Sequence, residues 1–250
     1  MDYQRRFGGI ARLYGAESLQ TFADARVCVI GVGGVGSWAV ESLARSAIGQ
    51  LTLIDMDHVA ESNINRQLPA MEDSLGRAKI SVMQERIQSI NPQAIVCLID
   101  DFVTTENLGQ IITPEFDYVI DCIDSFRVKA ALISHCKNNR IKIVTVGGAG
   151  GQIDPTRIRQ TDLSRTEQDP LLAKIRRQLR QQYRFPRNPK RSFGVPAIWS
   201  DEPLMIVDKC TPVADAGLNC GGFGSCTPVT AGFGMAAAAF VLKKLAEKNA

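Results

Sequence analysis

Residues 26–57, RVCVIGVGGVGSWAVESLARSAIGQLTLIDMD, join two apolar runs through a glycine-rich turn and end on two acidic residues. The first run, from Arg26 to Ile30, is rich in β-branched and apolar residues and predicts a buried strand. Four glycines follow it and contain the spacing G-x-G-x-x-G, at Gly31, Gly33, Gly34 and Gly36. This order predicts a strand, a tight turn and a helix over 37–46.

The glycine-rich turn has the composition of a phosphate-binding loop. Glycine lets the backbone approach a phosphate closely, and the first N–H groups of the following helix point at such an anion. Asp55 comes nineteen residues after Gly36, at the end of a second apolar strand, where an acid can accept hydrogen bonds from ribose hydroxyls. A tight turn without a ligand would not require that acid. We therefore predict a nucleotide site.

The chain up to Gly151 continues to alternate between strand and helix patterns. Apolar runs predict strands over 51–55, 94–99, 118–121 and 141–146, and helical patterns cover 76–90, 105–112, capped by Thr104, and 125–139. Near-continuous apolar strands that alternate with helices are typical of a parallel sheet covered on both faces. The sequence therefore predicts an α/β fold with a doubly wound, mostly parallel sheet.

The pattern changes after Gly151. We expect strands over 152–160 and 204–207, a basic helix over 168–182, a glycine-rich loop over 217–226 and a closing helix over 229–248 capped by Thr227. No low-complexity linker separates this part from the rest. We therefore expect one domain in three parts: an N-terminal helical segment (1–25), a nucleotide-binding core (26–151) and an added C-terminal lobe (152–250).

The composition is that of an ordinary globular protein. The chain has 250 residues, of which 45% are hydrophobic, and a net charge of +3 that singles out no class of partner. Seven cysteines without regular pairing distances favour a reducing compartment, and the first residues lack the apolar core of a signal peptide. The longest apolar run, 229–242, is shorter than the roughly 20 residues that span a bilayer. We expect a cytoplasmic protein without membrane contact.

Charged and amide side chains gather after the predicted strands. The long connection that follows the second strand exceeds an ordinary strand-to-helix loop and carries several of them. The full set is Asp55, Asp57, Asn63, Arg66, Gln67, Lys79, Asp124 and Ser125. Cations and acids together suit a triphosphate and its metal ion better than a nicotinamide dinucleotide, so hydride transfer is the weaker interpretation. A role for Asp124 or Ser125 only as helix caps stays open.

In combination these motifs resemble the ubiquitin-activating-enzyme superfamily, which includes the bacterial activators of sulfur-carrier proteins. The resemblance implies a Rossmann-like ATP-binding half in which Gly33, Gly34 and Gly36 line the phosphates and Asp55 takes the ribose. It also implies that Asn63, Arg66 and Lys79 neutralise the phosphate chain and that Asp124 holds Mg²⁺. Fixed cations and a metal ion suit attack on the α-phosphate, because charge develops on the departing pyrophosphate.

Three further segments narrow the resemblance to one branch. RFGGIARLYG at 6–15, VGGAGGQIDPTRI at 146–158 and NCGGFGS at 219–225 are similar to the tRNA threonylcarbamoyladenosine dehydratases. The chain also lacks the paired C-x-x-C motifs that bind zinc in many sulfur-carrier activators, so we expect no zinc. Two other interpretations stay open: adenylation of the C-terminus of a ubiquitin-like carrier protein, and a nucleotide-sensing module without catalysis.

Membership of the dehydratase branch would imply a defined reaction and set of partners. The enzyme would activate the threonyl carboxylate of threonylcarbamoyladenosine in tRNA with ATP and then close a ring with net loss of water. Its partners would be tRNA and a second copy of the chain in a homodimer. A monovalent cation and a sulfur-transfer system of the cysteine desulfurase type are further candidates.

A basic segment in the C-terminal lobe gives separate support for an RNA substrate. No acidic residue occurs between Asp169 and Asp201, and eight cations there are interleaved with Tyr183, Phe185 and Phe193. Such a segment can neutralise phosphates and offer rings to unpaired bases. The RNA-binding candidates are Arg176, Arg177, Arg180 and Arg184. A solvated basic helix is the alternative.

The catalytic candidates are Arg66, Lys79, Asp124 and Cys220. A cysteine would be needed only if the acyl group passed to a thiol, and Cys220 or Cys226 in the glycine-rich loop would then be the nucleophile. Ring closure by a nitrogen of the substrate needs no thiol. Both possibilities stay open at the level of sequence.

Overall fold

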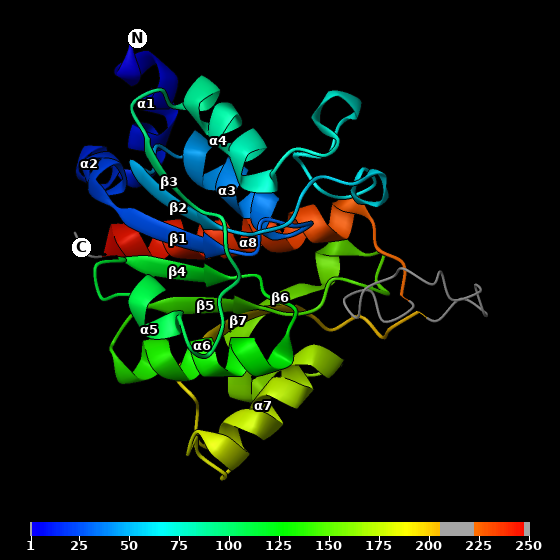
Figure 1. The fold of residues 1–250 in the computed structure, drawn as a ribbon. Helices are drawn as coiled ribbons and strands as arrows, with labels where there is room; N and C mark the ends of the chain where they lie inside the picture. The colour runs from blue at the N-terminus through cyan, green and yellow to red at the C-terminus, as the bar shows by residue number, and fades with distance from the viewer. Residues whose placement is uncertain (1, 206–222, 248–250) are drawn as a thin grey trace.

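The computed structural model describes residues 2–205 and 223–247 and shows one seven-stranded sheet with helices on both faces (Figure 1). The strands are β1 (Arg26–Ile30), β2 (Gln50–Ile54), β3 (Ile95–Ile99), β4 (Tyr118–Asp121), β5 (Ile143–Val146), β6 (Ile158–Asp162) and β7 (Pro196–Ser200). Their order across the sheet is β3-β2-β1-β4-β5-β7-β6, and every neighbouring pair is parallel except β6 with β7. The predicted α/β class with a doubly wound, mostly parallel sheet is confirmed.

Helices cover both faces of the sheet and divide the core in two. They are α1 (Tyr3–Tyr14), α2 (Ala16–Asp24), α3 (Gly36–Arg45), α4 (Lys79–Ile90), α5 (Leu108–Ile111), α6 (Phe126–Asn138), α7 (Pro170–Gln182) and α8 (Thr227–Ala246), with short 3₁₀ turns η1 (Glu61–Asn63), η2 (Glu72–Ser74), η3 (Pro155–Arg157) and η4 (Leu163–Arg165). Residues of α3, α4 and α8 form the larger core cluster on one face, and residues of α5, α6 and α7 form the second cluster on the other. This three-layer arrangement holds the strand ends rigidly.

Helix α8 lies in the core against α3. A side chain at Gly234 would come within 2.4 Å of the carbonyl oxygen of Val35, so the two helices touch backbone to backbone. By length and composition alone α8 could cross a membrane, and it is the one such helix among the described residues. Its apolar residues are explained by the core instead, because 56% of its most apolar window is buried.

The strand predicted over 152–160 is wrong for its first half. The chain there forms the 3₁₀ turn η3, and β6 begins only at Ile158. Pro155 has no N–H to give to a ladder, and the Asp154 carboxylate accepts the N–H of Thr156 at 2.9 Å. The buried carboxylate of Glu202 takes the N–H groups of Ile153 and Asp154. Side chains therefore satisfy this backbone in place of a neighbouring strand.

The strand predicted over 204–207 is also wrong for its two described residues. Leu204 and Met205 lie in irregular structure, and 206–207 fall outside the described residues. The strand that the sequence analysis missed is β7, which begins with Pro196 and pairs with both β5 and β6. Proline is tolerated as the first residue of a strand because its missing N–H is then not needed.

The predicted caps of two helices need correction. Helix α5 begins at Leu108 with Asn107 as its N-cap. Thr104 lies three residues before that N-cap, and its hydroxyl accepts the N–H of Asn107 at 3.3 Å. Cys226, not Thr227, is the N-cap of α8. The hydroxyl of Thr227 donates to the carbonyl of Asn65 at 2.6 Å, so it joins α8 to the connection after β2.

Candidate active site

The residues predicted to bind the nucleotide lie at one edge of the sheet, where β1, β2 and β4 end. In Figure 1 the arrowheads of β1 and β4 point towards this edge. The strand order reverses at β1, which pairs with β2 on one side and with β4 on the other. In open α/β sheets the crevice at such a reversal is where ligands bind.

The glycine-rich loop is packed so tightly that two of its residues can only be glycine. Gly31 has a φ of +83°, and a Cβ there would lie 2.9 Å from the carbonyl oxygen of Cys122. A Cβ at Gly36 would lie 1.8 Å from the carbonyl oxygen of Gly31. The loop therefore lies directly on the turn that follows β4, and no side chain can be accommodated at these two positions.

The connection after β2 folds back over this loop. A Cβ at Gly34 would come 3.2 Å from Cγ of Arg66, and one at Gly33 would come 3.9 Å from Nε2 of Gln67. The indole of Trp38 in α3 donates to the carbonyl of Arg66 at 3.0 Å and fixes this segment. Arg66 and Gln67 are thus brought against Gly33 and Gly34.

Several hydrogen bonds hold this connection in place. The buried Asn63 accepts the N–H of Ala60 through Oδ1 at 3.1 Å, and Arg66 donates to the carbonyl of Ser62 at 2.8 Å. Gln67 is buried, and its Oε1 has no hydrogen-bond partner within the described part of the chain. A buried amide oxygen beside a glycine loop is a group that a ligand or water would be expected to satisfy.

Asp55 lies buried beneath the glycine loop. One carboxylate oxygen accepts the N–H of Val32 at 2.6 Å, and the other accepts the N–H of Asp57 at 2.8 Å. Burial raises the pKa of Asp55, while the two N–H groups and the charge of Lys79 act in the opposite direction. Asp55 therefore ties β2 to the loop and leaves lone pairs for a further donor.

Lys79, the first residue of α4, forms an ion pair with Asp57. The ammonium of Lys79 lies 2.8 Å from the carboxylate of Asp57, and Lys79 is almost completely buried while Asp57 is more than half exposed. Since Lys79 also acts on the charge of Asp55, the cation lies close to the end of β2. Because the Asp57 carboxylate is exposed to water, a phosphate group could replace it as the partner of the Lys79 ammonium.

The turn after β4 carries Asp124 and Ser125, and both are exposed. Ser125 occupies the N-cap position of α6, but its side chain makes no cap hydrogen bond. The pKa of Asp124 is raised, mainly by partial loss of solvent; Lys129 opposes the shift, and the nearby charge of Asp57 adds to it. The carboxylates that follow β2 and β4, on either side of β1, therefore repel each other, and a cation between them would relieve that repulsion.

Comparison with known proteins identifies the family. The model of the ThiF family matches residues 3–250. The chain belongs to the ThiF family. The tRNA threonylcarbamoyladenosine dehydratase of Haemophilus influenzae is 52% identical to it, over 99% of this chain and 96% of the relative. This ThiF-family chain therefore falls in the dehydratase branch, as its three short segments predicted.

Solved structures and a more distant relative agree with that placement. Crystal structures of the Escherichia coli tRNA N6-threonylcarbamoyladenosine dehydratase in complex with AMP and with ATP match at TM-scores of 0.91 and 0.89. Each is 50% identical, and the matches cover all of this chain and 98% and 97% of the other. The molybdopterin-synthase adenylyltransferase of E. coli is 29% identical, over 58% of this chain and 57% of its own.

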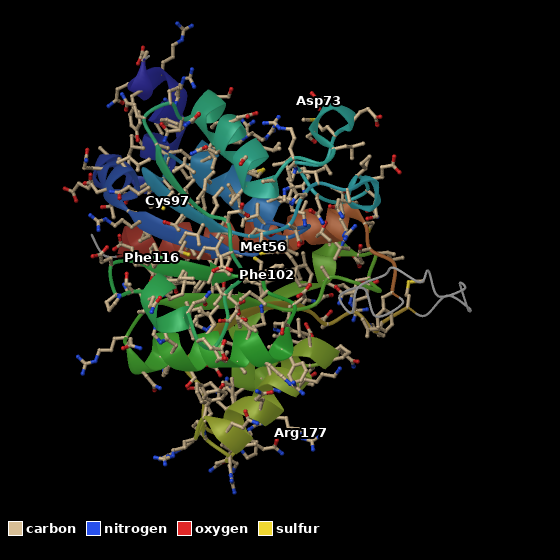
Figure 2. All side chains as sticks on the ribbon, viewed as in Figure 1. Met56, Asp73, Cys97, Phe102, Phe116 and Arg177 are labelled. Atoms are coloured by element: carbon tan, nitrogen blue, oxygen red, sulfur yellow. The ribbon has the colours of Figure 1, made fainter. Side chains whose placement is uncertain are left out.

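Of the four arginines predicted to bind RNA, two are exposed and two make contacts within the C-terminal lobe. Arg177 and Arg184 are exposed, and Figure 2 shows Arg177 pointing away from the protein. Arg176 donates to the hydroxyl of Thr166, and the guanidinium of Arg180 stacks 5.1 Å from the ring centre of Phe193 while donating to the carbonyl of Pro186. The guanidinium groups of these two arginines are therefore engaged in contacts within the lobe.

The prediction that Phe185 and Phe193 stack on bases is wrong. They are 8% and 2% exposed and pack edge to face in the second core cluster. The apolar stripe of α7, formed by Leu172, Ile175 and Leu179, needs cover, and the segment after the helix folds back to supply it. Burial of apolar surface thus decides the orientation of both rings.

Two cysteines near the site, Cys122 and Cys226, lie among the described residues. Cys220, the predicted nucleophile, lies outside them. The Sγ of Cys226 lies 3.8 Å from the carbonyl oxygen of Gln152, at the start of α8. Burial raises the pKa of Cys122 to about 12, so that thiol stays protonated at neutral pH.

Two groups of residues at this edge escaped the sequence analysis. Met56, which directly follows Asp55, and Phe102 come after the neighbouring strands β2 and β3 and are 47% and 52% exposed (Figure 2). Lys129 of α6 is fully buried and bonds to the turn before Asp124. A signal for Lys129 was present, because it shares the helical spacing of the apolar Leu132 and Ile133.

Proposed function

We propose that this chain is an ATP-dependent tRNA-modifying enzyme that activates the threonyl carboxylate of threonylcarbamoyladenosine and closes it into a ring. The observation that carries the proposal is that Arg66 lies over Gly34 of the glycine-rich loop, while Lys79 and Asp124 lie near Asp57 at the ends of β2 and β4. A simple nucleotide sensor needs the loop and Asp55 alone. Formation of an acyl-adenylate also requires cations beside the phosphates, here Arg66 and Lys79, and a carboxylate that can hold the metal ion, here Asp124.

The first step forms a mixed anhydride. The threonyl carboxylate attacks the α-phosphorus of ATP, and the bond to the β-phosphate breaks with release of pyrophosphate. Negative charge then grows on the leaving group, and Arg66 and Lys79 would stabilise it from fixed positions. Asn63 and Gln67 would bind the phosphate oxygens as neutral donors through their amide nitrogens.

The second step closes the ring. A nitrogen of the substrate's own carbamoyl group attacks the activated carbonyl carbon, loses its proton and displaces AMP. One carboxylate oxygen leaves on the AMP, so the substrate loses one water overall. Neither step needs an enzyme thiol, so the proposal does not depend on Cys220.

The ATP would be bound along the strand ends. The N–H groups of the loop from Gly31 to Gly36 would bind the phosphates, and Asp55 would accept a ribose hydroxyl. Met56 and Phe102 supply an exposed thioether and ring after the neighbouring strands β2 and β3, suited to the faces of adenine.

Mg²⁺ fits the end of β4. No three His, Cys, Asp or Glu side chains within residues 2–205 and 223–247 are arranged to hold a metal ion by themselves. Mg²⁺, however, is usually bound by one or two carboxylates together with substrate phosphates, and Asp124 with Asp57 nearby matches that need. When bound, the ion would neutralise charge on the pyrophosphate. A monovalent cation stays a prediction without a candidate site.

ATP–pyrophosphate exchange tests the function directly. We expect exchange with purified tRNA that carries threonylcarbamoyladenosine, and little with the same tRNA prepared without the modification. A ubiquitin-like carrier protein should give none. Exchange that responded to carrier and ignored tRNA would establish the alternative function, and no exchange with either would leave only a nucleotide-binding protein.

Two exposed arginines, Arg177 in α7 and Arg184 just after it, support tRNA as the macromolecular partner. We expect the double variant Arg177→Ala/Arg184→Ala to weaken tRNA binding and to lower the slope of log K against log salt by about 1.4 to 1.8, because each lost phosphate contact removes about 0.7 to 0.9 from that slope. The control Arg5→Ala/Lys142→Ala removes two exposed charges elsewhere. An equal slope in both variants would show that α7 is only a solvated helix.

We further infer a homodimer in the cytoplasm, as the family resemblance suggests. Two-fold dimers are the commonest oligomers of soluble proteins. Sedimentation at micromolar concentration should give twice the 27.3 kDa mass of the chain. A monomer under those conditions would contradict the inference. A sulfur-transfer partner stays a prediction, and pull-down with a cysteine desulfurase would test it.

A further inference from the structure

A fully buried ion pair lies directly beneath the turn that carries Asp124. Lys129 in α6 and Asp121 at the end of β4 are both 0% exposed, and Nζ of Lys129 lies 3.0 Å from Oδ1 of Asp121. Isolated buried ion pairs often stabilise a protein no better than well-packed apolar residues would. Stability alone therefore does not account for this one.

The ammonium of Lys129 directs its contacts to one turn. Besides the carboxylate of Asp121, it donates to the carbonyl of Asp121 at 2.9 Å and to the carbonyl of Ile123 at 2.9 Å. An ammonium has three N–H donors, and these contacts use all three. The cation thus grips the backbone on both sides of Cys122.

The carboxylate of Asp121 completes the same turn. Its Oδ1 accepts the N–H of Ile123 at 3.1 Å, and its Oδ2 accepts the hydroxyl of Thr145 in β5 at 2.7 Å. Residues 121–123 are therefore held by a lysine from α6, a threonine from β5 and their own carboxylate. Asp124 is the next residue, so its backbone continues directly from this hydrogen-bonded turn.

The same turn also contacts the glycine-rich loop. The carbonyl oxygen of Cys122 is the atom nearest to the missing side chain of Gly31. Lys129 binds the turn over residues 121–123. This turn contacts Gly31 through Cys122 and leads directly into Asp124. A 1 Å displacement of a metal-binding carboxylate would matter, because Mg²⁺ requires near-ideal geometry.

We propose that Lys129 is a positioning residue that, paired with Asp121, sets the Asp124 carboxylate for the Mg²⁺ of the nucleotide. The inference rests on the proposed role of Asp124 and adds the residue that fixes its geometry. Lys129 itself touches neither nucleotide nor metal ion.

The test measures metal-dependent nucleotide binding without catalysis. α,β-Methylene-ATP cannot be cleaved at the α-phosphate, so its dissociation constant can be compared in EDTA and in Mg²⁺. The double variant Asp121→Asn/Lys129→Met removes both charges at near-constant volume and avoids leaving one buried charge unpaired. We expect its dissociation constant in EDTA to stay within about threefold of wild type, and the strengthening by Mg²⁺ to fall by about tenfold or more, as for other groups that orient metal ligands.

Thr145→Val is the matched control. It removes one buried hydrogen bond from Asp121 and keeps Lys129 on the turn, so it should lower the melting temperature while Mg²⁺ strengthens binding as in wild type. Full strengthening by Mg²⁺ in the folded double variant would overturn the proposal. Equal losses in EDTA and in Mg²⁺ would also overturn it, because the pair would then support the nucleotide site as a whole.

Asp124→Asn separates this inference from the function on which it rests. If that variant keeps the full Mg²⁺ effect, the assignment of Asp124 as metal ligand fails, whatever the double variant does. If Asp124→Asn loses the effect and the double variant keeps it, only the role of Lys129 fails. Should the double variant not fold, Lys129→Arg keeps the charge with altered donors, and the proposal requires a reduced Mg²⁺ effect there.

Discussion

Asp124→Asn should lower ATP–pyrophosphate exchange by about a hundredfold to a thousandfold while the protein stays folded. The side chain is exposed, and exposed substitutions usually change the free energy of unfolding by less than about 0.5 kcal/mol. The loss should appear in exchange because the amide replaces a charged Mg²⁺ ligand with a neutral one, and metal stabilisation of the leaving group is worth several kcal/mol.

The control for this variant is Asp73→Asn. Asp73 is an exposed acid of η2, at the tip of the connection after β2 and away from the strand ends (Figure 2). It removes the same charge and should leave exchange within about twofold of wild type. Calorimetry in EDTA should give both variants the ATP affinity of wild type. Normal exchange by Asp124→Asn would remove Asp124 from the metal site.

The nucleotide-binding core could be predicted because its signals are local. The glycines from Gly31 to Gly36 predict a tight turn by their spacing alone. Acids that follow apolar runs mark the ends of strands, and in a parallel sheet these ends lie at one edge. The predicted strand over 118–121 and helix over 125–139 match β4 and α6 to within one residue. No long-range information was needed to place Asp55, Lys79 and Asp124 near the same loop.

The C-terminal lobe could not be predicted as well because its structure depends on distant partners. Strand β7 is stabilised by hydrogen bonds to β5 and β6, which lie far from it in the sequence. It also begins with a proline, which normally indicates the end of a strand or helix. Phe185 and Phe193 lie among arginines in the sequence, yet both are buried because they pack in the same core cluster as the apolar residues of α7. Only the tertiary fold shows which side of such a segment meets water.

The buried pair of Asp121 and Lys129 illustrates a different limit. Its two members come from a strand end and a helix face, and the sequence alone shows a lysine within a helix, which is normally solvated. That Lys129 is buried follows from the packing of α6 on the sheet. Helical spacing could have marked the position as buried, but it could not have named Asp121 as the partner.

Lys79→Met should reduce ATP–pyrophosphate exchange by about a hundredfold and weaken ATP binding by at least tenfold. Methionine keeps the length and apolar character of the buried stem and removes the charge. The partner carboxylate of Asp57 is more than half exposed, so water can solvate it when the cation is lost. The free energy of unfolding should therefore fall by only about 1 kcal/mol, in contrast to the 3–5 kcal/mol typical of breaking a fully buried pair.

Asp57→Asn is the control that separates the charge of Lys79 from the ion pair. It breaks the same pair and keeps the cation, so the affinity for ATP measured in EDTA, where the proposed Mg²⁺ role of Asp57 does not enter, should remain within about threefold of wild type. A similar loss in both variants would mean that the pair, and not the cation, shapes the site. Unchanged exchange in Lys79→Met would remove Lys79 from the phosphate-binding set, and Arg66 would then be the remaining predicted cation beside the glycine-rich loop, because its side chain lies over Gly34.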